Sequence, residues 1–236
     1  EAIRYSWILL LKPEQIIMIT QCVRLCLVFS VFSFSITAHG QILTDEPPPK
    51  RTVSYKTSGT VKNTSVKTGT YNYVDELIKA DKEFEDSNYT AAARIFLKYP
   101  EKLDDEQCYR LGYMYQFGYG LSQDYANAFR WYQKALDKGN IMAMYKMGVF
   151  YANGYSVPKD YLTALQWYQR AADKENPDAM NNLGRMLEDG NGVPKDNEKA
   201  FQWFQKAADK GLALAMNNLA VCYEDGIGTR KDNLKC

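Results

Sequence analysis

The chain has very little of what most enzymes use for catalysis. It contains one histidine, His39, among its 236 residues. Because His39 lies in an N-terminal stretch that we expect to be removed, the rest of the chain can build neither a Ser-His-Asp or Cys-His site nor an imidazole metal site. Three cysteines follow that stretch, an odd number without paired spacing, which argues against a disulfide framework. We therefore expect no catalytic residue, no metal and no cofactor.

The chain also lacks an excess of charge of either sign. The formal net charge is +1, and no block of basic residues stands out. Nucleic-acid-binding proteins carry a basic patch or stripe, so we expect no nucleic-acid partner.

The N-terminal region has the order of a secretory signal. The sequence does not begin with methionine, and Met18 is the start that we expect. Arg24 then supplies positive charge, residues 25–36 are apolar, and residues 38–40 offer small side chains before Gln41. The apolar run is too short for a membrane span. We expect an N-terminal extension and signal peptide over 1–40, export to the periplasm, cell envelope or exterior, and no stable span after cleavage. The alternatives are an uncleaved anchor and an upstream translation artefact.

Residues 41–72 are rich in Thr, Ser, Lys and Pro. Such a composition offers little to build a core, so we interpret this segment as a flexible linker. Residues 73–106 resemble a degenerate first unit of the pattern described next, because Ala92 and Phe96 precede Ala128 and Tyr132 by one period. Atypical terminal units are expected to act as caps.

The rest of the chain repeats itself every 36 residues. The most regular positions are Trp131, Trp167 and Trp203, then Gly118, Gly154, Gly190 and Gly226, and Asp124, Asp160, Asp196 and Asp232. A fixed period of this size marks stacked units of secondary structure.

Each unit reads as two amphipathic helices. In the first helix of one unit, Ala143, Met147 and Phe150 form an apolar stripe that contains Gly148. A glycine inside a helix costs roughly 1 kcal/mol relative to alanine, so its recurrence indicates close approach of a neighbouring helix. In the second helix, Ala164, Trp167, Tyr168, Ala171 and Ala172 form the stripe that we expect to be buried.

The consensus is A-x3-[LM]-G-x2-[YL]-x2-G-x-[GS]-V-P-K-D-x3-A-x2-W-[YF]-x-[KR]-A-A-D-K-G. It closely resembles the Sel1-like repeat, a relative of the tetratricopeptide repeat. By this resemblance we divide the chain into units 107–142, 143–178 and 179–214 and a partial unit 215–236. The resemblance implies an all-α fold, a right-handed α/α solenoid, that holds a protein or peptide partner.

In related repeats the first helices line the concave face. Aligned units place three rows there, and these rows vary while the core positions repeat. We therefore predict that the partner contacts Tyr109, Tyr113, Tyr145, Asn181, Arg185, Glu188, Asn217 and Glu224. The groove would be aromatic at its N-terminal end and polar and acidic at its C-terminal end, which suits an extended segment with apolar residues at one end and basic ones at the other. The alternative is that these residues are exposed to solvent and bind no partner.

An enzymatic alternative rests on two short motifs. Ser156-Val157-Pro158-Lys159 matches S-x-x-K and Lys67-Thr68-Gly69 matches K-T-G, as in penicillin-binding proteins and β-lactamases. Their order is reversed relative to serine β-lactamases, and the first motif lies in the connector between helices. A β-lactamase-like or penicillin-binding protein of the cell envelope is the second hypothesis.

Overall fold

The structure, a computed structural model, describes residues 73–228. The predicted signal peptide, the linker and the last eight residues of the partial unit lie outside the described residues. Within them, no helix combines the length and apolar character that a membrane crossing requires.

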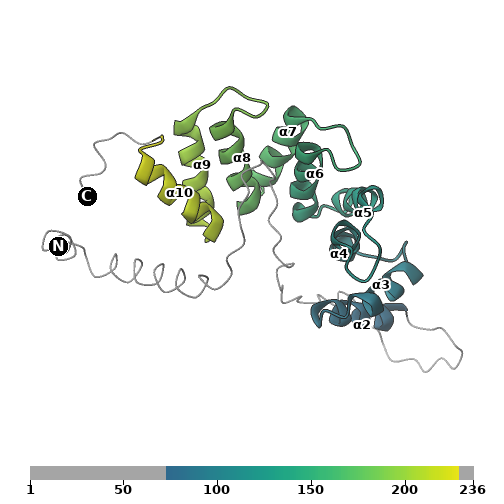
Figure 1. Cartoon of the computed structure of the whole chain (residues 1–236). Helices are drawn as coiled ribbons and strands as arrows, with labels where there is room; N and C mark the ends of the chain where they lie inside the picture. The colour runs from purple at the N-terminus through teal and green to yellow at the C-terminus, as the bar shows by residue number, and fades with distance from the viewer. Residues whose placement is uncertain (1–72, 229–236) are drawn as a thin grey trace, which may run out of the picture. The chain divides into compact units, whose positions relative to one another are not determined.

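The described part of the chain contains nine α-helices and no strand (Figure 1). They are α2 Tyr73–Glu85, α3 Tyr89–Lys98, α4 Asp105–Phe117, α5 Tyr125–Asp137, α6 Ile141–Asn153, α7 Tyr161–Ala172, α8 Pro177–Asp189, α9 Asn197–Asp209 and α10 Ala213–Asp225. Each helix packs against the next one along the chain, most extensively within the hairpins α4–α5, α6–α7 and α8–α9. The predicted helix–turn–helix units and the all-α solenoid class are confirmed.

The ends of the helices lie where the recurring residues predict. Gly118, Gly154 and Gly190 follow α4, α6 and α8 in the left-handed conformation, with φ between 74° and 77°. Asp124 and Asp160 each cap the next helix by accepting hydrogen bonds from backbone N–H groups of its first turn. These caps accept hydrogen bonds from N–H groups that have no partner within the helix. The residues of each connector therefore determine where the next helix begins.

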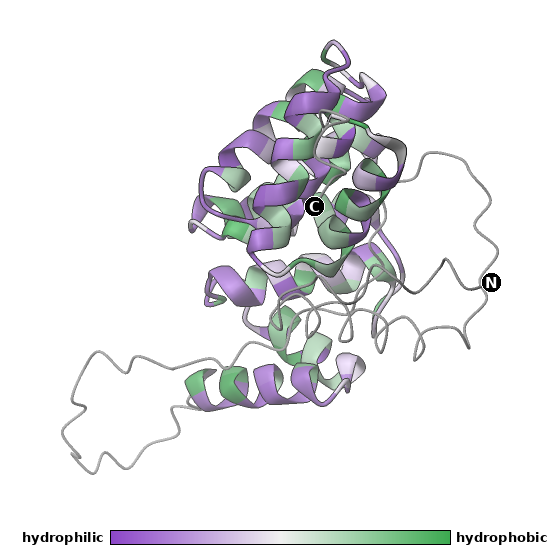
Figure 2. Cartoon of the chain, turned by 90° about the vertical axis from the view of Figure 1, so that its left-hand side faces the viewer, coloured by the Kyte–Doolittle hydropathy of each residue, from purple (hydrophilic) through white to green (hydrophobic). Residues whose placement is uncertain are grey.

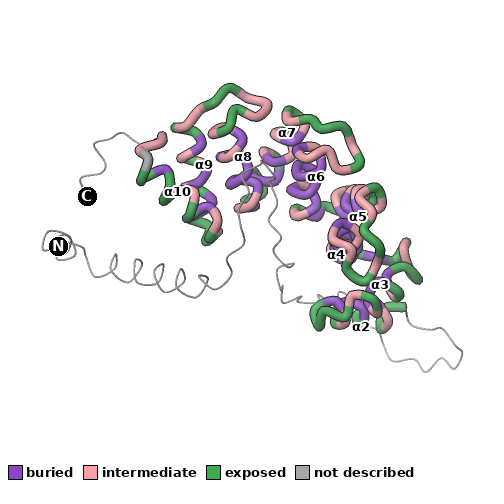
Figure 3. Tube along the Cα trace, in the orientation of Figure 1, coloured by how far each residue is buried: buried purple, intermediate pink, exposed green. Residues whose placement is uncertain are grey.

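Polar and apolar residues alternate around the helices (Figure 2), and the connectors between α6 and α7 and between α8 and α9 consist of intermediate and exposed residues (Figure 3). Such helices are stabilised mainly by burying their apolar sides against each other.

The glycine inside each first helix lies against an aromatic ring of the second helix. A Cβ atom built on Gly112, Gly148 or Gly184 would lie only 2.8, 2.5 or 2.6 Å from a carbon of Tyr132, Tyr168 or Phe204, respectively. All three rings are fully buried. The close helix approach predicted for these glycines is therefore confirmed.

The expected place of Trp167 in the core is wrong, because the fully buried ring belongs to its neighbour Tyr168. Trp167 and Trp203 are half-buried and pack against the edge of the core. Cations three residues later cover the tryptophan rings, with Arg170 Cζ 4.4 Å from the Trp167 centroid and Lys206 Nζ 4.2 Å from that of Trp203. The tryptophans thus recur at the border between core and solvent.

The hairpin of α2 and α3 precedes the regular units. Its Ala92 and Phe96 are fully buried, as the alignment predicts. A buried ion pair ties it to α4, with Arg110 Nη1 3.2 Å from Asp81 Oδ1, and Gln107 Nε2 donates to the same carboxylate at 2.8 Å. Removing one partner of such a buried pair leaves an uncompensated charge, which is strongly destabilising. The contact between α2 and α4 therefore depends on both side chains.

Replacing Gly148 with alanine tests the glycine–ring contact. Although alanine favours helix, its methyl group would overlap the Tyr168 ring, so we expect the free energy of unfolding to fall by about 1–3 kcal/mol. Urea unfolding followed by circular dichroism measures it. Gln166→Ala, at an exposed site on α7, is the control and should change stability by less than about 0.5 kcal/mol. Equal or greater stability of Gly148→Ala would contradict the packing described.

Candidate partner-binding surface

The eight predicted partner-binding residues all lie on first helices, but their exposure differs. Four are buried: Tyr109, Tyr113, Tyr145 and Asn181 are 3%, 2%, 4% and 1% exposed. Arg185 and Glu188 on α8 are half-buried, and Asn217 and Glu224 on α10 are exposed. The equivalent positions therefore differ between the first and the last units.

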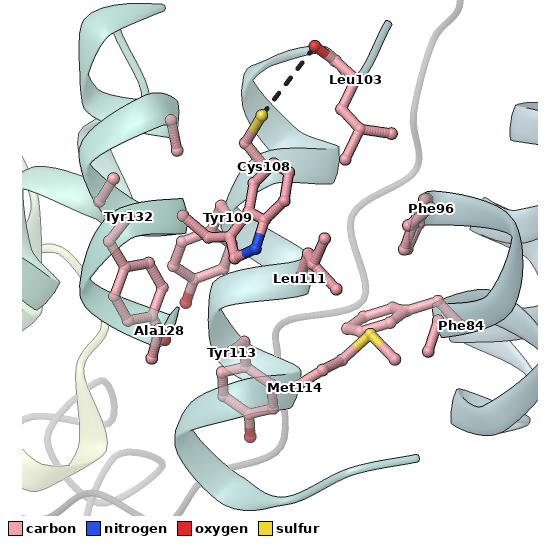
Figure 4. Close-up of a cluster of buried hydrophobic side chains, with 14 of the residues drawn as sticks. Phe84, Phe96, Leu103, Cys108, Tyr109, Leu111, Tyr113, Met114, Ala128 and Tyr132 are labelled. Carbon is pink, nitrogen blue, oxygen red and sulfur yellow. Dashed lines mark hydrogen bonds between the residues drawn. The ribbon is translucent and has the colours of Figure 1, made fainter. Parts of the chain in front are cut away.

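The three tyrosines belong to the core, which corrects the expectation that they lie outside it. The Tyr109 ring lies 5.6 Å from that of Tyr132 and 6.5 Å from that of Tyr113 (Figure 4). The Tyr145 ring lies 6.0 Å from that of Tyr168. Burial raises the pKa of Tyr109 well above its usual range. Substituting these tyrosines therefore changes folding as well as any surface.

A buried cation lies among the aromatic residues. Lys146 Nζ is 5.7 Å from the ring centroid of Tyr113, 5.6 Å from that of Phe117 and 5.4 Å from that of Tyr145. Ring faces are electron-rich and stabilise a nearby ammonium group. The N-terminal end of the predicted surface thus holds a buried cation among its buried tyrosines, which the sequence analysis did not predict.

The C-terminal end is polar and partly acidic. Desolvation, followed by the charge of Asp189, raises the pKa of Glu188, whereas Arg185 opposes that rise. Asn218 Nδ2 donates to Asn181 Oδ1 at 2.8 Å and so links α10 to α8. Asn217, Asp189 and Glu224 remain exposed to a partner.

Sequence reasoning missed a second polar row beside the predicted ones. This row consists of Arg110, Lys146, Asn182 and Asn218, and its first three members are buried. The sequence did contain a signal for this row, because a polar residue recurs one position after Tyr109 and after each of its equivalents. It was overlooked because charged and amide side chains are usually assigned to the surface.

A pocket of about 410 Å³ lies near the start of α4, α6 and α8. Its wall includes Tyr109 and the carboxylates of Asp105, Glu106, Glu175 and Asp178, together with Lys174. Asn140 Nδ2 donates to Asp105 Oδ2 at 3.1 Å across the boundary between two units. Carboxylates outnumber cations in this wall, so the pocket favours binding of a basic group over binding of an acidic one.

Of the two motifs of the enzymatic alternative, the structure describes only Ser156-Val157-Pro158-Lys159. Ser156 lies in an exposed connector and donates to the backbone oxygen of Tyr125 at 3.2 Å. Lys159 lies over the Tyr161 ring, 4.6 Å from its centroid, and Lys67-Thr68-Gly69 falls outside the described residues. Cys108 and Cys222 are both buried in the core. Residues 73–228 hold no group of three or more potential metal ligands.

Comparison with known proteins matches the chain to the Sel1 repeat. The model of that repeat covers residues 108–140, 141–176, 177–212 and 213–236, more than half of the chain. A Sel1 repeat protein from Oxalobacter formigenes is similar, with 32% identity, a TM-score of 0.61, and coverage of 66% of this chain and 63% of that one. A protective antigen of uropathogenic Escherichia coli with an SLR fold shows 29% identity, a TM-score of 0.60, and coverage of 67% of this chain and 35% of that one. The chain therefore spans less than two thirds of either protein. A comparison with curated protein sequences found no match.

Replacing Tyr109 with alanine tests the burial of the tyrosine row. We expect the free energy of unfolding to fall by about 2–5 kcal/mol, the range for large-to-small changes in a core. Thermal unfolding by calorimetry measures it, with Asn217→Ala at the equivalent exposed position as control. Similar melting temperatures for both variants would place Tyr109 outside the core.

Proposed function

The chain belongs to the Sel1 repeat family, and on that premise we propose that it is an exported scaffold that binds an extended partner segment along its first helices. Proteins built from Sel1 repeats typically act through protein–protein interaction. The observation that carries the proposal is the set of polar and charged side chains that α8 and α10 present, with Arg185 and Glu188 half-buried and Glu224 exposed.

The accessible residues indicate the chemistry of the partner. Glu188, Asp189 and Glu224 make the surface of α8 and α10 acidic, and carboxylates also outnumber cations in the wall of the pocket near α4, α6 and α8. Complementary charge steers encounter and selects partners more than it adds affinity. We propose a partner segment with basic residues over α8 and α10 and apolar residues toward the tyrosines.

Binding of short peptide pools tests this proposal. One pool carries apolar residues in one half and Lys or Arg in the other, and the matched pool carries Asp or Glu instead. We expect fluorescence anisotropy to show tighter binding of the basic pool, and Glu188→Gln with Glu224→Gln to weaken it by about 0.5–2 kcal/mol at low salt.

Gln166→Ala and Gln202→Ala change exposed residues of the second helices and serve as controls. Loss of binding in these controls, with the glutamine variants of α8 and α10 unchanged, would move the partner to the second helices. Equal binding of both pools would contradict the charge argument.

Export is the second part of the proposal, and the signal-like order of residues 18–40 supports it. Expression from Met18 with a C-terminal tag should yield a product whose first residue is at or near Gln41, as determined by N-terminal sequencing of cell fractions. An intact product confined to the cytoplasm would refute export and leave the binding proposal standing.

A further inference from the structure

The pocket at the start of α4, α6 and α8 collects carboxylates from different repeats. Asp105 and Glu106 belong to α4, Asp178 to the first turn of α8, and Glu175 to the turn that precedes α8. The first three are half-buried, whereas Glu175 and the cation of the wall, Lys174, are exposed. The half-buried part of this wall is therefore acidic.

A capping residue holds the two carboxylates of α4 in place. Asn140 Oδ1 caps α6 by accepting from the backbone N–H of Ala143 at 2.9 Å, which fixes the Asn140 side chain. Its Nδ2 donates to Asp105 Oδ2 at 3.1 Å and to Glu106 Oε2 at 3.4 Å. The other oxygen of Glu106 lies 3.4 Å from Arg110 Nε. Because a carboxylate offers about four lone-pair sites, these contacts orient both groups and leave them able to accept further hydrogen bonds.

A buried tyrosine completes the wall. Tyr109 lines the pocket and is 3% exposed. Burial raises the pKa of its hydroxyl, and the charges of Glu106 and, more weakly, of Asp178 add to that rise, so both carboxylates lie near the hydroxyl. The hydroxyl makes no hydrogen bond with any described residue. Since nearly all buried polar groups in proteins have a partner, this hydroxyl at the edge of a cavity indicates a ligand that bonds to it there.

The helix packing of the solenoid is compatible with other residues at the four acidic positions. One period of 36 residues later, each carboxylate is replaced by an apolar residue or by glycine. The pairs are Asp105 and Ile141, Glu106 and Met142, Glu175 and Gly211, and Asp178 and Leu214. The acidic wall is thus a property of this pocket and not of the repeat.

Glu175 also has a strained backbone. Its φ is 63°, in the left-handed region where the equivalent Gly139 and Gly211 lie at 92° and 88°. A residue with a side chain is disfavoured there relative to glycine. Its ion pair with Lys210, at 3.1 Å, is exposed and contributes little to stability. Neither conformation nor ion pairing therefore accounts for a glutamate at this position.

We propose that this pocket binds the guanidinium group of an arginine side chain in the partner segment. The planar fork of five N–H donors matches carboxylates that converge from α4 and α8, and the Tyr109 hydroxyl oxygen accepts a further bond. A guanidinium is more weakly hydrated than an ammonium, so its transfer to a half-buried site costs less. The pocket, at about 410 Å³, has room for the group. This inference rests on the proposed function and places one of the partner's basic residues at the start of α8.

The first test titrates the full chain with Nα-acetylarginine amide at low salt. The citrulline analogue has nearly the same shape but no charge, and the lysine analogue carries an ammonium instead. The chain is labelled with ¹⁵N-asparagine, and Asn140→Asp, which keeps a capping oxygen, identifies the Asn140 side-chain resonance. We expect a saturable shift of that resonance with the arginine compound, weaker binding of the lysine analogue, and no shift with citrulline.

The remote Asn218 side chain should not respond to any of the three compounds. No shift of Asn140 with the arginine compound would overturn the pocket. An equal response to citrulline, or tighter binding of the lysine analogue, would overturn the guanidinium assignment.

The second test uses variants that preserve the packing. Asp178→Asn and Tyr109→Phe keep the size of each side chain and should each weaken binding of Nα-acetylarginine amide about tenfold, as for the loss of one hydrogen bond to a charged group. Glu175→Gly introduces the residue of the neighbouring units, so it should be at least as stable as the parent and bind about threefold more weakly.

Glu198→Gln removes an exposed charge of α9, outside the pocket wall, and is the control. Circular dichroism checks the fold of each variant. Unchanged affinity of both Asp178→Asn and Tyr109→Phe, or an equal loss in Glu198→Gln, would contradict the site.

The outcomes separate this inference from the proposed function. Equal binding of the basic peptide pool by the parent and by Asp178→Asn supports the scaffold and rejects the pocket. A response to Nα-acetylarginine amide without binding of either pool supports the pocket and rejects the partner chemistry proposed for α8 and α10.

Discussion

The contact between a glycine of one helix and an aromatic ring of the next sets the geometry of every regular unit. Gly112, Gly148 and Gly184 have no side chain, so a ring can lie against the helix backbone where any Cβ would overlap it. The glycine weakens the helix by roughly 1 kcal/mol relative to alanine. Full burial of an aromatic ring contributes more than that, about 1.5–3 kcal/mol. The pair therefore stabilises the hairpin even though one member disfavours helix.

That contact leaves a polar problem which each unit solves differently. A tyrosine ring locked against the glycine carries its hydroxyl to a fixed place, and a buried hydroxyl needs a partner. Gln116 supplies one for Tyr132, and Phe204 removes the need. At Tyr168 the nearby polar group is the Asn182 side chain of α8, so the second unit differs from its neighbours in the residue that lies beside the hydroxyl. Repeats that share one backbone can carry different side chains at the same position, and such differences can serve function without changing how the helices pack.

The period of the sequence predicted most of the fold. The helix ends at Gly118, Gly154 and Gly190 and the caps at Asp124 and Asp160 follow from local chemistry, which a sequence displays directly. Burial within a stripe was harder to predict. Trp167 and Tyr168 are adjacent aromatic residues on one helix, and only the glycine on the facing helix decides which ring is enclosed.

The candidate site was less predictable for the same reason. Asn181 and Asn217 occupy the same position in consecutive units, yet one is buried and the other is exposed. α10 covers Asn181, where Asn218 Nδ2 donates to Asn181 Oδ1 at 2.8 Å, whereas α10 is the last helix of the described residues and no described helix covers Asn217. The rows were chosen because they vary, but variation also arises in core residues that have alternative ways to pack, as the tyrosines show.

Burial of the tyrosines also determines how a partner can be held. Buried aromatic residues that fix the helices contribute to stability, and only their edges can contribute to an interface. Aromatic anchors are the usual source of high affinity, whereas charges at an interface rim mainly affect the rate of association and the choice of partner. A surface composed of Asn217, Glu188 and Glu224 offers hydrogen bonds and charge but few deep apolar contacts. Binding along these helices should therefore be moderate in affinity and sensitive to salt.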